Sequence, residues 1–308
     1  MRRSLALIAA LILAAAGALT GCGESESPLR VGYQRFGGLS LLKARGDAPD
    51  VTWSLFDSGP ALTEALKAGA IDIGQTGEAP PIFAAAAKTP FVIAATGAPS
   101  PKSEAVLVKA SRGYRTFADL RGRTIALNKG SNVHWLLVEL LEANGMTLDD
   151  VQVKYLKPAE GRPAFDNDQI DAWVIWDPYF ALAEQPGVQV LADATGLVNN
   201  REYVLVSKDA AEQKTEKIKS FLAAYEKTTA WGIANPDERA RILAPELKID
   251  EATTKRALAR AAQPFTPVTA EIGEELQGIA DGFTELELIP GSVDMRALID
   301  TRFAGSAP

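Results

Sequence analysis

The segment RTIALNKGSNVHWLLVELLEAN, residues 123–144, holds one complete strand, turn and helix. The β-branched and apolar residues at 123–128 predict a strand, and Gly130 predicts a turn. From residue 132 to 144 the apolar side chains recur at helical spacing. Strands that alternate with helices in this way form βαβ units and mostly parallel sheets, so the segment predicts an α/β fold.

The same alternation repeats along the chain from residue 29 onward. We expect strands at residues 29–34, 51–56, 71–75, 91–96, 104–108, 123–128, 151–156, 171–176, 188–192 and 203–207. We expect helices at residues 60–68, 81–87, 132–144 and 178–184, followed by a helical region with helices at 212–235, 250–260 and 269–285. Ten strands are many for one sheet, so the pattern predicts two sheets and two lobes.

Two extended segments, 104–109 and 201–208, are the expected crossings between the lobes. Lobe one would comprise residues 29–108 plus 207–308, and lobe two residues 110–204. Two lobes joined by two strands leave a cleft between them, and hinge closure around a ligand is the natural motion of that shape.

The N-terminus has the features of a secretory signal. Arg2 and Arg3 precede an apolar run from Leu5 to Leu19, which at about 15 residues is shorter than the ~20 that span a bilayer. The run ends in Leu-Thr-Gly-Cys, which resembles the bacterial lipobox, so we expect residues 1–21 to be removed and Cys22 to be acylated. Residues 22–28 would form a lipidated tether, and the protein would lie in the periplasm or cell envelope, anchored to a membrane.

Composition narrows the function further. Hydrophobic residues make up 47% and charged residues 23% of the chain, as in ordinary globular proteins. Loss of Arg2 and Arg3 moves the net charge from −7 to −9, which disfavours nucleic acid as a partner. His134 is the single histidine and Cys22 the single cysteine, so we expect no metal site, no cofactor and no catalytic triad.

Several strand ends carry residues suited to ligand binding. In open α/β sheets, ligands lie at the carboxyl ends of strands, where helices present unpaired N–H groups. Gly130 and Ser131 form such a turn before the helix that begins near Asn132, although Ser131 could equally serve only as a helix cap. Thr76, Gly77 and Glu78 repeat the design in the other lobe, with a tight capped turn as the alternative.

Three long motifs resemble one family, the periplasmic aliphatic sulfonate-binding proteins of ABC importers. They are TGEAPPIF at 76–83, ALNKGSNVH at 126–134 and DAWVIWDPY at 171–179. The resemblance implies a two-lobed periplasmic binding protein of type II with two crossover strands and a cleft between the lobes. It also implies a monomer that passes a small organosulfonate anion to a permease in the cytoplasmic membrane.

Carried over by position, the resemblance implies that Ser131 and the neighbouring N–H groups of Gly130 and Asn132 hold the sulfonate oxygens. The other implied ligand-binding residues are Gln34, Ser58, Thr76, Gly77 and Glu78 from lobe one, and Trp176 and Asp177 from lobe two. Trp176 could form an apolar wall of the cleft while Trp173 packs in the core.

Other functions remain to be weighed. The same fold could bind taurine, a sulfate ester, an aryl sulfonate, nitrate or a thiamin pyrimidine precursor. Some cytosolic relatives of the fold are pyridoxal phosphate-dependent enzymes, but the export signal and the single histidine disfavour that reading. A structural lipoprotein would leave the glycine-rich strand ends without a purpose.

Acylation of Cys22 can be tested directly. We expect mass spectrometry of the mature protein to identify Cys22 as the N-terminal residue and to find lipid on it. An unmodified Cys22 would instead place the protein among soluble periplasmic receptors.

Overall fold

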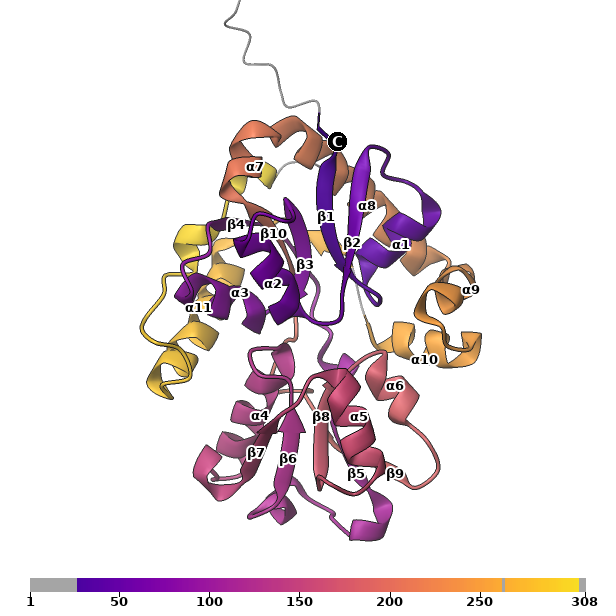
Figure 1. The fold of residues 1–308 in the computed structure, drawn as a ribbon, viewed down its shortest axis with the longest axis vertical. Helices are drawn as coiled ribbons and strands as arrows, with labels where there is room; N and C mark the ends of the chain where they lie inside the picture. Colours follow the sequence, from indigo (N-terminus) through magenta and orange to yellow (C-terminus); the bar gives the residue numbers. More distant parts are fainter. Residues whose placement is uncertain (1–26, 262–263, 305–308) are drawn as a thin grey trace, which may run out of the picture.

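The computed structural model describes residues 27–261 and 264–304, so the expected leader and Cys22 lie outside the described residues. Two lobes stand one above the other, each built on its own mixed sheet with helices on both faces (Figure 1). The predicted α/β class and the two-lobed architecture are confirmed.

Lobe one carries the six-stranded sheet, in the order β11-β4-β10-β3-β1-β2. Strands β1, β2 and β3 run parallel, and β10 lies antiparallel between β3 and β4. The strands are β1 (Leu29–Gln34), β2 (Val51–Phe56), β3 (Ile73–Gly77), β4 (Phe91–Gly97), β10 (Glu202–Ser207) and β11 (Phe265–Thr266).

Lobe two repeats the arrangement with five strands, in the order β7-β6-β8-β5-β9. Here β5 lies antiparallel between β8 and β9, while β6 pairs in parallel with β7 and β8. The strands are β5 (Glu104–Lys109), β6 (Thr124–Leu127), β7 (Gln152–Tyr155), β8 (Ala172–Trp176) and β9 (Val188–Asp193).

The helices cover the sheets and bury two apolar layers in each lobe. Lobe two holds α4 (Asn132–Ala143), α5 (Pro158–Asp166) and α6 (Tyr179–Ala183). Lobe one holds α1 (Gly38–Arg45), α2 (Gly59–Lys67), α3 (Ala79–Ala86), α7 (Lys208–Gln213), α8 (Thr215–Ala234), α9 (Pro236–Leu247), α10 (Glu251–Arg260) and α11 (Ala270–Glu285). Among the described helices, none is both long and apolar enough to cross a membrane.

Several helices differ from the sequence-based expectation, among them α5, which was not expected and which contains Gly161 and Pro163. The predicted helix at 212–235 is two helices, because the backbone of Lys214 leaves the helical region at φ −133°. Helix α1 was not expected, since it is buried on most sides and has no amphipathic pattern. Helix α9 was not expected either, because five charged residues among its twelve hide its apolar face.

The crossings between the lobes lie outside the strands that were expected to form them. Strand β5 pairs entirely within lobe two and β10 entirely within lobe one. The chain therefore crosses at residues 98–103 and 194–201, and the expected lobe boundaries at 108–110 and 204–207 are corrected to these segments. The reason is that each crossing segment leads into a strand that inserts in the middle of the sheet it reaches.

The two crossing segments are tied to each other by hydrogen bonds. The backbone N–H of Ser100 donates to the carbonyl of Asn199 at 2.9 Å, and the Ser100 hydroxyl donates to the carbonyl of Asn200 at 2.8 Å. In return, the side-chain amide of Asn200 donates to the Ser100 carbonyl at 3.1 Å and to the Ser103 hydroxyl at 2.9 Å. The two crossing segments therefore form one hydrogen-bonded ribbon.

Two carboxyl groups are buried where this ribbon meets the lobes. Glu78 precedes α3 in lobe one, and one of its oxygens accepts from the backbone N–H of Arg201 at 3.0 Å. Glu104 opens β5 in lobe two, and neither of its carboxyl oxygens has a hydrogen-bond partner within the described residues. Burial raises the pKa of Glu78 to about 8 and holds the pKa of Glu104 well above its usual range.

These buried carboxyls predict a loss of stability on the alkaline side. Between pH 6.5 and 8 the unfolded state has ionised Glu78 while the folded state still holds its proton, so the free energy of unfolding falls as pH rises. Glu78→Gln keeps an acceptor for Arg201 and should make this fall shallower in urea unfolding across that range.

The matched control is Glu64→Gln, which changes an exposed glutamate on α2. It should follow the wild-type pH profile. A Glu78→Gln profile as steep as wild type would contradict the assignment of the pH dependence to Glu78.

Candidate functional site

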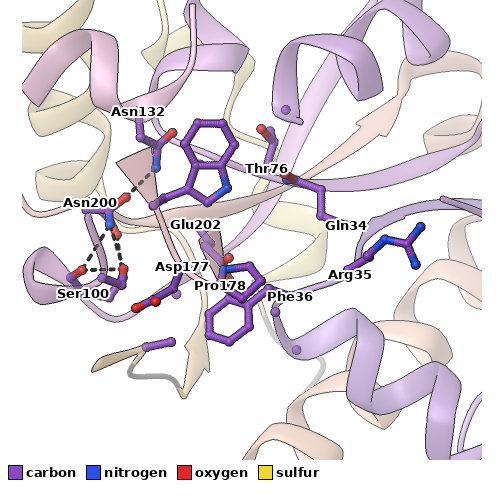
Figure 2. A pocket seen from close by; sticks show the side chains of 18 of the residues that line it. Gln34, Arg35, Phe36, Thr76, Ser100, Asn132, Asp177, Pro178, Asn200 and Glu202 are labelled. Carbon is purple, nitrogen blue, oxygen red and sulfur yellow. Dashed lines mark hydrogen bonds between the residues drawn. The ribbon is translucent and has the colours of Figure 1, made fainter. Parts of the chain in front are cut away.

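A cavity of about 240 Å³ lies between the lobes and is lined by residues of both (Figure 2). The ends of β1, β3 and β8 open into it, as do the residues that begin α2 and α4. This is the carboxyl edge of both sheets, where the sequence predicted ligand binding.

Lobe two contributes the first turn of α4. Ser131 and Asn132 line the cavity, and helix termini leave their first N–H groups without acceptors in the helix. The preceding loop is fixed internally, because the Ser131 hydroxyl donates to the carbonyl of Asn128 at 2.6 Å. Among the described residues, the N–H of Ser131 donates to the carbonyl of Asn128 and the N–H of His134 to the carbonyl of Ser131. The open donors are therefore the backbone N–H groups of Asn132 and Val133, and the hydroxyl of Ser131 would have to rotate to meet a ligand.

His134 holds this loop in place. Its Nδ1 atom accepts a hydrogen bond from the backbone N–H of Gly130 at 3.3 Å, which fixes the proton on Nε2. Burial lowers the pKa of His134 to about 4, so the ring is neutral at physiological pH. Gly130 does not line the cavity, and its N–H group is satisfied by His134.

Lobe one contributes Thr76 and Gly77 at the end of β3. The hydroxyl of Thr76 is buried, lines the cavity and has no hydrogen-bond partner among the described residues. Gly59 opens α2 directly beside it, and a side chain at Gly59 would collide with the Thr76 hydroxyl. Gly77 lies against the side chain of Asn132, where a Cβ atom would overlap it. Residues of both lobes meet in this set, which we call the polar end: Gly59, Thr76, Gly77, Ser131 and Asn132.

Another part of the cavity is apolar and is built by residues from α1, α6 and the C-terminal helices. Phe36, Leu41 and Leu247 belong to one apolar cluster between α1 and α9. Ile233 of α8 and Leu182 of α6 also line this part. We call these five residues the apolar end.

Charged groups line the wall between the two ends. Glu202 accepts a hydrogen bond from the amide of Gln75, and its burial raises the pKa to about 7, against the opposing effects of Gln75 and Arg239. The Nε atom of Arg239 is buried and without a partner among the described residues. Arg35 and Asp57 also line the cavity, and burial raises the pKa of Tyr179, on which these two groups act in opposite directions.

The two tryptophans of β8 lie in different surroundings, as the sequence suggested. Trp173 is 1% exposed and packs in the core of lobe two, whereas Trp176 lines the cavity and contacts the Tyr179 ring edge-on at 5.9 Å. Gln34 lines the cavity as well.

Three of the expected ligand-binding residues do not line the cavity. Ser58 is buried and precedes α2, Glu78 faces the crossing segment, and Gly130 packs against Phe83. Asp177 does line it, but both of its carboxyl oxygens are taken by Arg260, at 2.8 and 2.9 Å. Burial raises the pKa of Asp177 to about 6, and Arg260 opposes that rise.

Sequence reasoning missed the residues that the crossing segments add to the wall. Ser100, Ser103 and Asn200 line the cavity, and Asn200 also accepts from the side chain of Asn132 (Figure 2). The available signal was their place directly before β5 and β10, on segments expected to connect the lobes.

Comparison with known proteins agrees with this geometry. The model of the NMT1/THI5-like family matches residues 57–239. A protein of Escherichia coli (strain K12) that is named for binding aliphatic sulfonates is 35% identical, with 97% of each chain covered.

Two solved structures extend the likeness to three dimensions. The periplasmic aliphatic sulphonate binding protein SsuA from Escherichia coli is 36% identical with a TM-score of 0.81, covering 91% of this chain and 99% of its own. The alkanesulfonate-binding protein SsuA from Xanthomonas axonopodis pv. citri, solved with MOPS bound, is 31% identical with a TM-score of 0.84, covering 90% and 99%. The chain therefore belongs to the NMT1/THI5-like family and, within it, to the group of the aliphatic sulfonate-binding proteins.

Proposed function

We propose that the protein is an extracytoplasmic receptor that captures aliphatic sulfonates by closing its two lobes and delivers them to an ABC importer. The observation that carries the proposal is the polar end of the cavity. There the hydroxyl of Thr76, which has no hydrogen-bond partner among the described residues, and the first turn of α4 line the same cavity. A buried donor without a partner is costly, and an anion placed between the lobes would satisfy it.

A sulfonate suits this set of donors. It stays ionised across physiological pH and presents three oxygens, which N–H groups at a helix N-terminus and a hydroxyl can hold without a buried countercharge. The apolar end gives an alkyl tail a place to leave water. A ligand with a charged head and an apolar tail therefore matches both ends of the cavity.

The expected localisation follows from the same role. We propose that acylated Cys22 holds the receptor at a membrane, near a permease that takes the ligand from the closed form. The relatives named above are binding proteins, which supports a receptor role over catalysis.

A sulfonate that carries an amine, such as taurine, is the second candidate. Glu202 and Asp57 put carboxyl groups in the cavity wall, where a protonated amine would find a counter-charge. The two candidates share the polar end and differ only in the tail.

Calorimetric titration distinguishes a preference for simple alkyl sulfonates from a preference for taurine. We expect binding of butanesulfonate and hexanesulfonate, with weaker binding of methanesulfonate because a shorter tail buries less apolar surface. Taurine binding tighter than butanesulfonate would favour the second candidate. Binding of nitrate or a thiamin pyrimidine precursor, with no response to any sulfonate, would overturn the proposal.

Thr76→Val tests the polar end. The variant keeps the shape of the side chain and removes the donor, so butanesulfonate affinity should fall by about 1–3 kcal/mol, the cost of one hydrogen bond to a charged group. Because the hydroxyl has no partner in the ligand-free protein, thermal stability should not fall. Ser131→Ala should also weaken binding.

Thr89→Val is the matched control for Thr76→Val. Thr89 is a buried threonine of the same lobe, placed after α3 and away from the cavity, so its loss should leave affinity unchanged. Unchanged affinity in Thr76→Val would place the anion elsewhere in the cavity.

A further inference from the structure

We propose that Arg260 is a latch that holds the two lobes closed over the ligand. The proposal rests on the proposed function, since closure matters there because it retains a captured ligand. Arg260 is the last residue of α10 on lobe one, and the groups that it binds directly follow β8 and α6 of lobe two.

The guanidinium group of Arg260 makes four hydrogen bonds across the gap between the lobes. Its Nε and one terminal nitrogen donate to the two carboxyl oxygens of Asp177 at 2.8 and 2.9 Å. The terminal nitrogens also donate to both oxygens of Glu184 at 3.0 Å each. Within the described part of the chain, every hydrogen bond of the Arg260 side chain goes to lobe two.

The Arg260 side chain also contacts an aromatic ring of lobe two. The guanidinium carbon of Arg260 lies 3.8 Å from the centroid of the Phe180 ring, so the planar group stacks on lobe two while its edge binds carboxylates. Lysine could make neither the forked contact nor the stacking.

The Asp177 carboxyl, which accepts these hydrogen bonds, is oriented by a residue of lobe two. Asp177 accepts from the backbone N–H of Ala181 at 3.1 Å, which orients its carboxyl before Arg260 arrives. The Asp177 side chain is fully buried, while Arg260 is 18% and Glu184 28% exposed. The latch is therefore geometrically specific and still open to water on one side, so it can be re-solvated when the lobes separate.

The latch differs from the contact on the other side of the cavity. There Trp135 of α4 packs edge-on against Phe283 of α11 at 5.1 Å, and Phe83 and His134 join the same cluster. In Figure 1, α4 and α11 lie on one side of the gap, and α6 and α10 on the other. Opening the aromatic side would expose buried rings to water. We therefore expect that separating the lobes on the Arg260 side costs less free energy.

The position of the latch links it to ligand retention. Asp177 and the next residue, Pro178, line the cavity, as does Ala261, which follows Arg260. Releasing Arg260 would open the cavity between β8 and α10. Loss of the latch should therefore speed ligand escape far more than it slows ligand entry.

Stopped-flow kinetics with butanesulfonate test the latch. We expect Arg260→Gln to raise the dissociation rate at least tenfold and to change the association rate less than twofold. Arg260→Lys should fall between the variant and wild type. Arg256→Gln, one turn earlier on α10 and exposed, is the matched control and should match wild type.

A double variant separates the latch from a loss of folding. Arg260→Gln leaves the buried Asp177 carboxyl unpaired, whereas Arg260→Gln with Asp177→Asn removes both charges. If the pair acts as one latch, the double variant should dissociate no faster than Arg260→Gln alone. Independent, multiplying effects of the two changes would overturn the latch.

Small-angle scattering of the ligand-free protein provides a readout that does not depend on the ligand. Arg260→Gln should have a larger radius of gyration than wild type and Arg256→Gln. If wild type fails to bind butanesulfonate while this difference persists, the proposed function fails and the latch stands. Equal radii together with equal dissociation rates would refute the latch.

Discussion

The structure depends on one topological constraint, which is that each crossing between the lobes ends in a strand inserted antiparallel into the middle of a sheet. β5 separates β8 from β9 in lobe two, and β10 separates β3 from β4 in lobe one. Neither sheet is complete without a strand that enters from the other lobe. Both crossings lead into central strands, and they bond to each other through Ser100 and Asn200. The cavity is thereby given a wall of two crossing segments that are hydrogen-bonded to each other.

Placement of charge explains how an acidic chain can hold an anion. The whole protein carries a net charge of −7, so its overall field does not attract anions. The polar end of the cavity instead offers the first turn of α4 and the hydroxyl of Thr76, both close to where the lobes meet. Two carboxyls close to the cavity are neutralised or engaged: Glu78 is held protonated by burial, and Asp177 is paired with Arg260.

Sequence reasoning succeeded where structure is set locally and failed where it depends on distant partners. Residues 123–144 carry their own strand, turn and helix signals, and strands β1 and β2 were predicted to the residue. Sheet membership of β5 could not be read from its sequence, because it depends on pairing with β8 and β9, more than sixty residues further on. The same limit hid the role of Asp177, since Arg260 lies 83 residues away in the chain. Thr76 was found because its strand end carries a motif, whereas Asn200 contributes through a loop with no local pattern.

The two ends of the cavity differ in which parts of the gene contribute to them. The polar end is built by β3, α2 and α4, within the first half of the chain. The apolar end combines Phe36 and Leu41 from the start of lobe one and Leu182 of α6 with Ile233 and Leu247 from the helices after residue 215. Substitutions or length changes in those late helices can reshape one part of the apolar end without touching the donors of the polar end. On the proposed function, a lineage with this layout can change which tails fit through a terminal stretch of coding sequence while the proposed anion site stays the same.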